Sequence, residues 1–128
     1  MAVLDRILIR KRKNEPALTA VNLLVADLPE WKEKKIDACY WLFGSLALHQ
    51  YDGPDGPLWK KWNEPMKNAI IPNQRLAKDG EKSGSWDPES DRWGHAGGRV
   101  YVTAMNALTL EVYYRYAAVF GAGKPINR

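Results

Sequence analysis

The chain has 128 residues and fits one domain, residues 1–128, with a single hydrophobic core. Its 45% apolar and 27% charged residues are ordinary for a globular protein, which excludes a disordered or fibrous chain. The net charge is only +4 and most Lys residues alternate with Asp and Glu, so nucleic-acid binding is not expected.

The amino-terminal segment, residues 1–13, is basic and amphipathic. Apolar residues at positions 1–4 and 7–9 precede the run Arg-Lys-Arg-Lys at positions 10–13. Such a segment either forms a solvated helix end, which is the commoner case, or rests on an anionic membrane surface. The second alternative predicts salt-sensitive binding of residues 6–13 to anionic vesicles.

The first two predicted helices follow this segment. Asn14 can cap the first helix, Pro16 lies in its first turn, and Pro29 stops it. Asp37 can cap the second helix. Because residues 38–48 are apolar on nearly all sides, we expect this second helix to be buried on all sides.

The third predicted helix is amphipathic and covers residues 57–70. Pro57 is placed to open it, and its apolar residues lie on one face with Lys, Asn and Glu on the other. This pattern predicts a helix of an outer layer. Pro65 predicts either a kink or a later start of the helix, at Asn63.

A long Gly-rich loop, residues 76–98, separates the third helix from the fourth. Loops of this length in compact domains usually have a function. The fourth predicted helix runs from about Arg99 to Phe120 and is nearly all apolar, so we expect it to be buried. Glu111 and Arg115 are spaced for an ion pair on it.

An internal repeat is indicated by two similar segments. Residues 44–48 match residues 106–110 in size at each position, at an offset of about 62 residues. Residues 18–22 also resemble residues 102–106. A period of about 60 residues favours helical hairpins, which bury their apolar faces by stacking on neighbouring hairpins.

Four segments carry a family resemblance. They are Gly-Ser-Trp-Asp-Pro at 84–88, Gly-Gly-Arg-Val-Tyr-Val-Thr-Ala at 97–104, Leu-Thr-Leu-Glu-Val-Tyr-Tyr-Arg-Tyr at 108–116, and Tyr-Trp-Leu-Phe-Gly-Ser-Leu-Ala-Leu at 40–48. The first three resemble the terminal repeat of the prenyltransferase and squalene-cyclase superfamily, and the last resembles its preceding inner helix. The resemblance covers residues 17–118. It implies a partial α/α toroid, with the second and fourth helices in the inner ring and the third in the outer ring.

The hallmark of that repeat is a Gln at the end of the outer helix, followed shortly by Gly-x-Trp. Gln74, Gly84 and Trp86 are similar to it, with residues 78–83 as an insertion. A Gln side chain at a helix end can satisfy free backbone groups, and a Trp ring adds a large buried area. We therefore interpret these three residues as a structural motif.

The catalytic residues of the family are largely missing. The Asp-x-Asp-Asp motif of the squalene and hopene cyclases does not occur, and we expect the carboxylates of residues 87–91 to be solvated. Asp-Ala-Cys-Tyr at 37–40 is similar to an element of the zinc-dependent prenyltransferases. However, no His stands at residues 101–103, where the resemblance would place the remaining ligand. The zinc set is incomplete, so no metal and no cofactor are expected, and Cys39 is interpreted as a small buried hydrophobic residue.

The chain is therefore expected to be a non-catalytic toroid-repeat module. It would bind a hydrophobic or isoprenoid ligand or a protein partner, which would be either the remaining repeats of a longer chain or further copies of itself. The expected lining residues are Asp37, Tyr40, Trp41, Tyr101, Thr103 and Asn106. The alternative is an isoprenoid cyclase or transferase that acts only as an oligomer or within a larger chain, with Asp37 as its acid or metal ligand.

The compartment expected from the sequence is the cytoplasm. Cys39 is the single cysteine and cannot form an internal disulfide, and no segment resembles a signal peptide. The longest apolar run, residues 38–48, is far shorter than the roughly 20 residues that span a bilayer.

Overall fold

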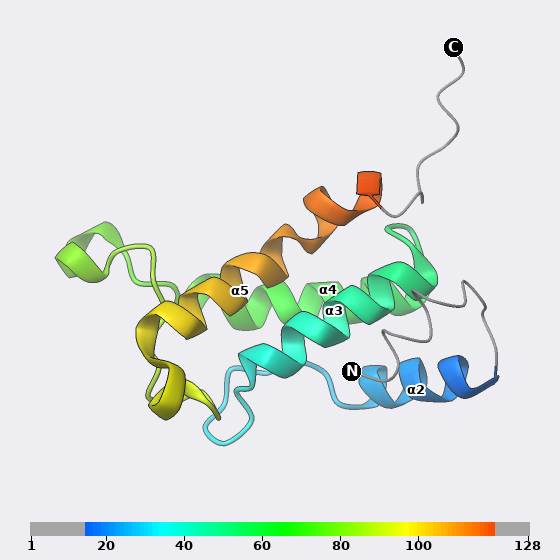
Figure 1. Ribbon diagram of the computed structural model, residues 1–128, viewed down its shortest axis with the longest axis horizontal. Coiled ribbons are helices and arrows are strands. Elements are labelled where there is room, and N and C mark those ends of the chain that lie inside the picture. The colour runs from blue at the N-terminus through cyan, green and yellow to red at the C-terminus, as the bar shows by residue number, and fades with distance from the viewer. Residues whose placement is uncertain (1–14, 120–128) are drawn as a thin grey trace, which may run out of the picture.

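The computed structural model describes the backbone of residues 15–119 and the side chains of residues 15–112. Within this part the chain is helical and has no β-strand (Figure 1). The elements are α2 (Glu15–Ala26), α3 (Ala38–Asp52), α4 (Pro57–Ile70), η1 (Ile71–Asn73), η2 (Ala77–Lys82) and α5 (Gly94–Val119). The prediction of an all-α chain with about four main helices is confirmed for the described residues. The basic segment 1–13, the cap Asn14, the side chain of Arg115 and the predicted helix end at Phe120 lie outside them.

The four α-helices alternate in direction. In Figure 1, α3 and α5 both run from left to right, whereas α2 and α4 run from right to left. Helix α3 contacts α2, α4 and α5, so it is the central helix of the described part. The prediction that the second helix is buried on all sides is confirmed in part, since eight of its 15 residues are buried and the others are half-buried.

Both ends of α3 are defined by specific hydrogen bonds. The Asp37 side chain accepts a hydrogen bond from the backbone N–H of Tyr40, which makes Asp37 the predicted N-cap. At the other end, Gly53 has φ +78° and donates its N–H to the His49 carbonyl at 2.9 Å. A glycine is favoured there because a residue with a side chain rarely adopts a positive φ.

Helix α4 begins at Pro57 and continues through Pro65, so the alternative of a start at Asn63 is wrong. The Asp52 carboxylate fixes its first turn, because it accepts hydrogen bonds from the backbone N–H groups of Leu58 and Trp59 at 2.7 and 3.1 Å. The predicted amphipathic character is confirmed, since the buried residues lie on one face. These are Trp59, Trp62, Met66, Ala69 and Ile70.

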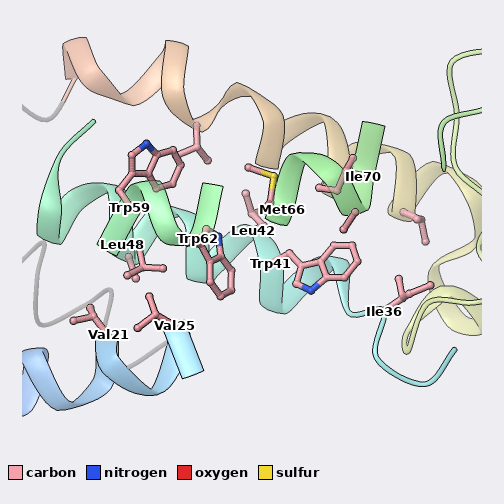
Figure 2. Close-up of a cluster of buried hydrophobic side chains, with 14 of the residues drawn as sticks. Val21, Val25, Ile36, Trp41, Leu42, Leu48, Trp59, Trp62, Met66 and Ile70 are labelled. Carbon is pink, nitrogen blue, oxygen red and sulfur yellow. The ribbon is translucent and has the colours of Figure 1, made fainter. Parts of the chain in front are cut away.

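Four buried tryptophans belong to the core, and Figure 2 labels three of them. Trp41 comes from α3, and Trp59 and Trp62 come from α4; apolar side chains of α2, including Val21 and Val25, contribute to the same cluster. The Trp62 indole N–H donates to the Ser45 hydroxyl at 2.8 Å, which pairs its polar atom inside the core. Core packing therefore accounts for four of the six tryptophans of the chain, since Trp86 belongs to the same cluster.

Gly44→Ala is expected to destabilise the protein although alanine is the better helix former. A Cβ atom at Gly44 would lie 2.7 Å from a ring atom of Trp62. The helix-propensity gain is about 1 kcal/mol, whereas overpacking of a core costs about 1–3 kcal/mol, so we expect a net loss of up to about 2 kcal/mol. Chemical denaturation followed by circular dichroism measures it. The loss should shrink in a Trp62→Phe background, and a stabilising Gly44→Ala would contradict this packing.

Helix α5 has a break near its start. Gly98 has φ +67° and ψ −170°, so the first turn at residues 94–97 is separated from the long helix that begins at Arg99, as predicted. The prediction that this helix is buried is wrong for one of its faces. Val100 is 83% exposed, and Ala104, Ala107 and Glu111 on the same face are exposed as well. Among the described residues, no helix of the structure is long and apolar enough to cross a membrane.

Candidate functional site

The start of α3 is held by two carboxylates. Besides Asp37, the Asp91 side chain accepts hydrogen bonds from the backbone N–H groups of Ala38 and Trp93, both at 2.8 Å. Asp91 is only 6% exposed. Carboxylates are favoured at this end of a helix because the free N–H groups and the helix dipole both attract negative charge.

The turn around Asp91 therefore docks onto α3 from 53 residues away. The adjacent Arg92 donates its backbone N–H to the Ile36 carbonyl at 2.9 Å, and its guanidinium lies 3.7 Å from the Asp37 carboxylate. The prediction that the carboxylates of residues 87–91 are solvated is wrong for Asp91. It is also wrong for Asp87, which pairs with two arginines, and it holds for Glu89, which is exposed.

Asp87 lies between Arg75 and Arg99 and forms ion pairs with both. Arg99 also donates to the Ser85 hydroxyl at 3.0 Å. Arg99, at the start of the long helix of α5, thereby binds Asp87 and Ser85 of the loop that follows α4. This loop is the Gly-rich stretch 76–98, in which the sequence showed no periodicity.

Gln74, Gly84 and Trp86 lie together where this loop returns to α4. The Gln74 amide donates to the Gly84 carbonyl at 2.8 Å, and the Trp86 indole N–H donates to the Ile70 carbonyl at 2.8 Å. Gly84 has φ +78°, a conformation that favours glycine. The Trp86 indole, which is 2% exposed, satisfies a carbonyl at the end of α4, whereas the Gln74 side chain, expected to do so, binds a carbonyl of the loop.

Two different depressions lie beside the first turn of α3. The first has a volume of about 460 Å³, and Asp37, Tyr40 and Trp41 contribute to its lining. Burial, and then the negative charges of Asp27 and Asp37, raise the pKa of the Tyr40 hydroxyl. Trp41 is nearly inaccessible itself, and its ring packs at 6.0 Å from that of Trp31.

The second depression is apolar and has a volume of about 400 Å³. Cys39 and Tyr101 line it and are hydrogen-bonded to each other through their side chains, and Trp93, 48% exposed, forms another wall. Burial and the neighbouring Cys39, Asp91 and Asp37 raise the pKa of Tyr101 to about 12. Cys39 is only half-buried, so it is more accessible than its interpretation as a small buried hydrophobic residue implied.

A half-buried apolar strip continues from this second depression along α3 and α5. Cys39 meets Tyr101 across the parallel helices, at the same offset as the internal sequence repeat. Side chains three and four residues further along each helix lie on the same face. We define the α3–α5 strip as the six half-buried residues Cys39, Phe43, Leu46, Tyr101, Met105 and Leu108.

The six predicted lining residues are not brought together in one site. Asp37, Tyr40 and Trp41 line the first depression, and Tyr101 lines the second. Thr103 is half-buried, and its hydroxyl accepts the backbone N–H of Trp86 at 3.3 Å. Asn106 is fully buried, and its side chain finds no hydrogen-bond partner among the described residues.

Three residues beside these depressions were missed by sequence reasoning. Trp93 and Arg92 belong to the loop 76–98, where an aromatic residue amid glycines was the available signal. Lys34 lies in the charged segment before Asp37, and no local pattern distinguishes it from its neighbours. Its backbone conformation is visible only in the structure.

His49 is a buried titratable group in the core. Its ring packs edge to face on Trp59 at 4.9 Å, and neither ring nitrogen has a hydrogen-bond partner among the described residues. Burial lowers the pKa of His49, so the neutral form is favoured in the folded protein.

The free energy of unfolding is therefore expected to fall between pH 7 and pH 5. Below its ordinary pKa of about 6.5, His49 takes up a proton in the unfolded chain before it does so in the folded one. A difference of one bound proton between the unfolded and the folded chain lowers the free energy of unfolding by about 1.4 kcal/mol for each pH unit, which is the upper limit for His49. Urea denaturation at pH 7 and pH 5 measures it. The fall should shrink in His49→Leu and persist in the exposed control His95→Gln; an equal fall in His49→Leu would contradict this assignment.

Metal binding finds no support in the described part of the chain. There, no group of three or more His, Cys, Asp or Glu side chains is arranged to hold a metal ion. Asp37 and Cys39, the two residues similar to zinc ligands, have no third partner of this kind among the described residues.

Comparisons with known proteins add no family to this picture. No protein-family model, no curated protein and no solved structure matches the chain. The resemblance to the prenyltransferase and squalene-cyclase superfamily stays a prediction.

Proposed function

We propose that the chain is a non-catalytic section of an α/α toroid that binds a hydrophobic ligand of isoprenoid type through the α3–α5 strip. In this arrangement α3 and α5 are neighbouring inner helices, and α2 and α4 are outer helices. The alternating directions of the four helices and the parallel pairing of the two helices that carry the sequence repeat support it. The hydrogen bonds from Gln74 to the Gly84 carbonyl and from Trp86 to the Ile70 carbonyl support it as well.

The α3–α5 strip is the observation that carries the binding proposal. Its residues stand at matching positions, 39, 43 and 46 on α3 and 101, 105 and 108 on α5, and each is half-buried. No charged side chain belongs to it, and at 1.5 Å per residue it is roughly 10 Å long. A surface of this kind gains free energy when a hydrocarbon covers the apolar area that water still reaches.

The carboxylates of the site favour binding over catalysis. Asp37 and Asp91 are occupied as caps of α3, and Asp87 is held between two arginines. A carboxylate that acts as a strong acid needs a free proton-donating form in a site without water. If squalene or an allylic diphosphate were converted by the chain, and if Asp37→Asn abolished the conversion, the non-catalytic proposal would be wrong.

The binding proposal is tested by titrating the full chain with farnesol in a calorimeter. Leu108→Gln should weaken binding about fivefold, because covering half a Leu side chain is worth about 1 kcal/mol. Leu76→Gln, at an exposed leucine outside the strip, is the matched control and should leave the affinity unchanged.

Light scattering on the same samples measures self-association, the partner alternative. A monomer that binds no farnesol would contradict the proposal. Equal losses of affinity in Leu108→Gln and Leu76→Gln would contradict the assignment to the strip.

A further inference from the structure

The first depression beside α3 combines an apolar floor with a charged rim. It lies between the loop after α2 and the first turn of α3, and its volume of about 460 Å³ is in the range of small-molecule sites. We call it the charged cleft. Its apolar floor includes Leu28, Ile36 and Trp41. Its charged rim includes Lys34, Lys35 and Arg92.

The positive charges of this cleft are not equally available to a ligand. Arg92 lies 3.7 Å from Asp37, and Lys35 lies 3.1 Å from Glu30. The Lys34 ammonium has no carboxylate within ion-pair distance among the described residues. Asp27 and Asp37 also line the cleft and oppose a ligand with a high negative charge, so a head group with one or at most two negative charges fits best.

The backbone at Lys34 is a second, independent observation. Its φ of +67° is the only positive φ of a non-glycine residue within the described part of the chain. Gly or Asn adopts this conformation at lower cost, so a lysine here carries a conformational penalty. No ion pair of its side chain with another described residue offsets this penalty. Such outliers concentrate at ligand-binding positions.

We infer that the charged cleft binds a small anionic amphiphile. Its carboxylate or phosphate monoester group would lie against Lys34 and Arg92, and its hydrocarbon part would cover Leu28 and Ile36. This site is separate from the α3–α5 strip, since the two depressions are lined by different residues. The inference therefore does not depend on the proposed function.

Four eight-carbon probes, each below its micelle concentration, test the inference by calorimetric titration of the full chain. Octanoate and octyl phosphate carry the two candidate anionic groups, octyl glucoside is neutral, and octyltrimethylammonium is cationic. At least one anionic probe should bind at least tenfold more tightly than the neutral and cationic probes. The anionic probe that binds more tightly identifies the acidic group of the ligand as a carboxylate or a phosphate. Binding of the chain to vesicles that contain phosphatidic acid shows whether a membrane lipid can also supply that group.

Three variants separate recognition from folding. Lys34→Gln should weaken anion binding at least fivefold. The control Lys60→Gln, which removes one positive charge from an exposed position of α4, should change the affinity less than twofold. Lys34→Gly should weaken binding similarly while its melting temperature stays equal or rises, because glycine adopts the positive φ freely.

Four outcomes would overturn the inference. They are equal affinity for the neutral and anionic probes, tighter binding of the cationic probe, unchanged affinity in Lys34→Gln, and absence of binding by every probe. Leu108→Gln should not affect octanoate or octyl phosphate, which keeps a failure of this inference distinct from a failure of the strip.

Discussion

Trp86→Ala is expected to lower the free energy of unfolding by about 3–5 kcal/mol, the usual cost of deleting a fully buried tryptophan side chain. The ring is 2% exposed, and its indole N–H satisfies the Ile70 carbonyl at the end of α4. Small domains have only about 5–15 kcal/mol of stability in total, so this variant should be close to unfolding. Urea denaturation followed by circular dichroism measures the loss without relying on tryptophan fluorescence.

Two further variants identify the source of the Trp86 effect. Trp86→Phe keeps an aromatic ring but leaves the Ile70 carbonyl unpaired, so we expect an intermediate loss of about 1–3 kcal/mol. Trp93→Phe alters a tryptophan that is 48% exposed and should change stability by less than about 0.5 kcal/mol. Similar losses in the Trp86 and Trp93 variants would show that Trp86 does not join α4 to the loop before α5.

Asp91→Ala is expected to cost about 2–3 kcal/mol. The substitution leaves the N–H groups of Ala38 and Trp93 without their acceptor and removes a negative charge from the start of α3. Asp91→Asn keeps one side-chain oxygen as an acceptor, so its loss should be smaller. Thermal and urea denaturation at pH 7 measure both variants.

Glu89→Ala is the matched control for Asp91, because it removes an exposed carboxylate two residues away. Its effect should stay within about 0.5 kcal/mol. Equal effects of Asp91→Ala and Glu89→Ala would contradict the long-range cap of α3 and, with it, the docking of Trp93 beside Cys39.

Local sequence signals predicted much of the helical structure. Asp37 caps α3 and Pro57 opens α4 as expected, and the α5 helix proper begins at Arg99 as expected. These signals work because capping and proline geometry depend on a few neighbouring residues. Cys39 and Tyr101, which occupy matching positions of the predicted sequence repeat, contact each other, and the repeat itself stays a prediction.

Long-range contacts decided what the sequence did not predict. Helix α4 contains Pro65 and starts at Pro57, where Asp52, a residue of the preceding helix, binds the N–H groups of its first turn. Asp91 is buried because it reaches the start of α3, a partner that no local pattern identifies. The composition of α5 likewise does not reveal which of its faces packs against the other helices. The exposed Val100 shows that one face of α5 is in contact with solvent.

The candidate site was only partly predictable for the same reason. The aromatic residues Tyr40, Trp41 and Tyr101 were selected as one lining, but helix packing sends them to two different depressions. The hydroxyl of Thr103 and the burial of Asn106 belong to the packing of α5. Trp93 and Lys34 acquire their positions from tertiary structure and backbone conformation.

The most direct test of the account is a nuclear magnetic resonance titration of the full chain with farnesol. The proposed binding surface predicts that amide signals of the strip, from Cys39 to Leu46 and from Tyr101 to Leu108, shift together and saturate at one dissociation constant. Signals of the control region around Leu76 should stay in place. Saturating shifts confined to other surfaces, or no shifts at all, would contradict the proposal that the α3–α5 strip binds a hydrophobic ligand.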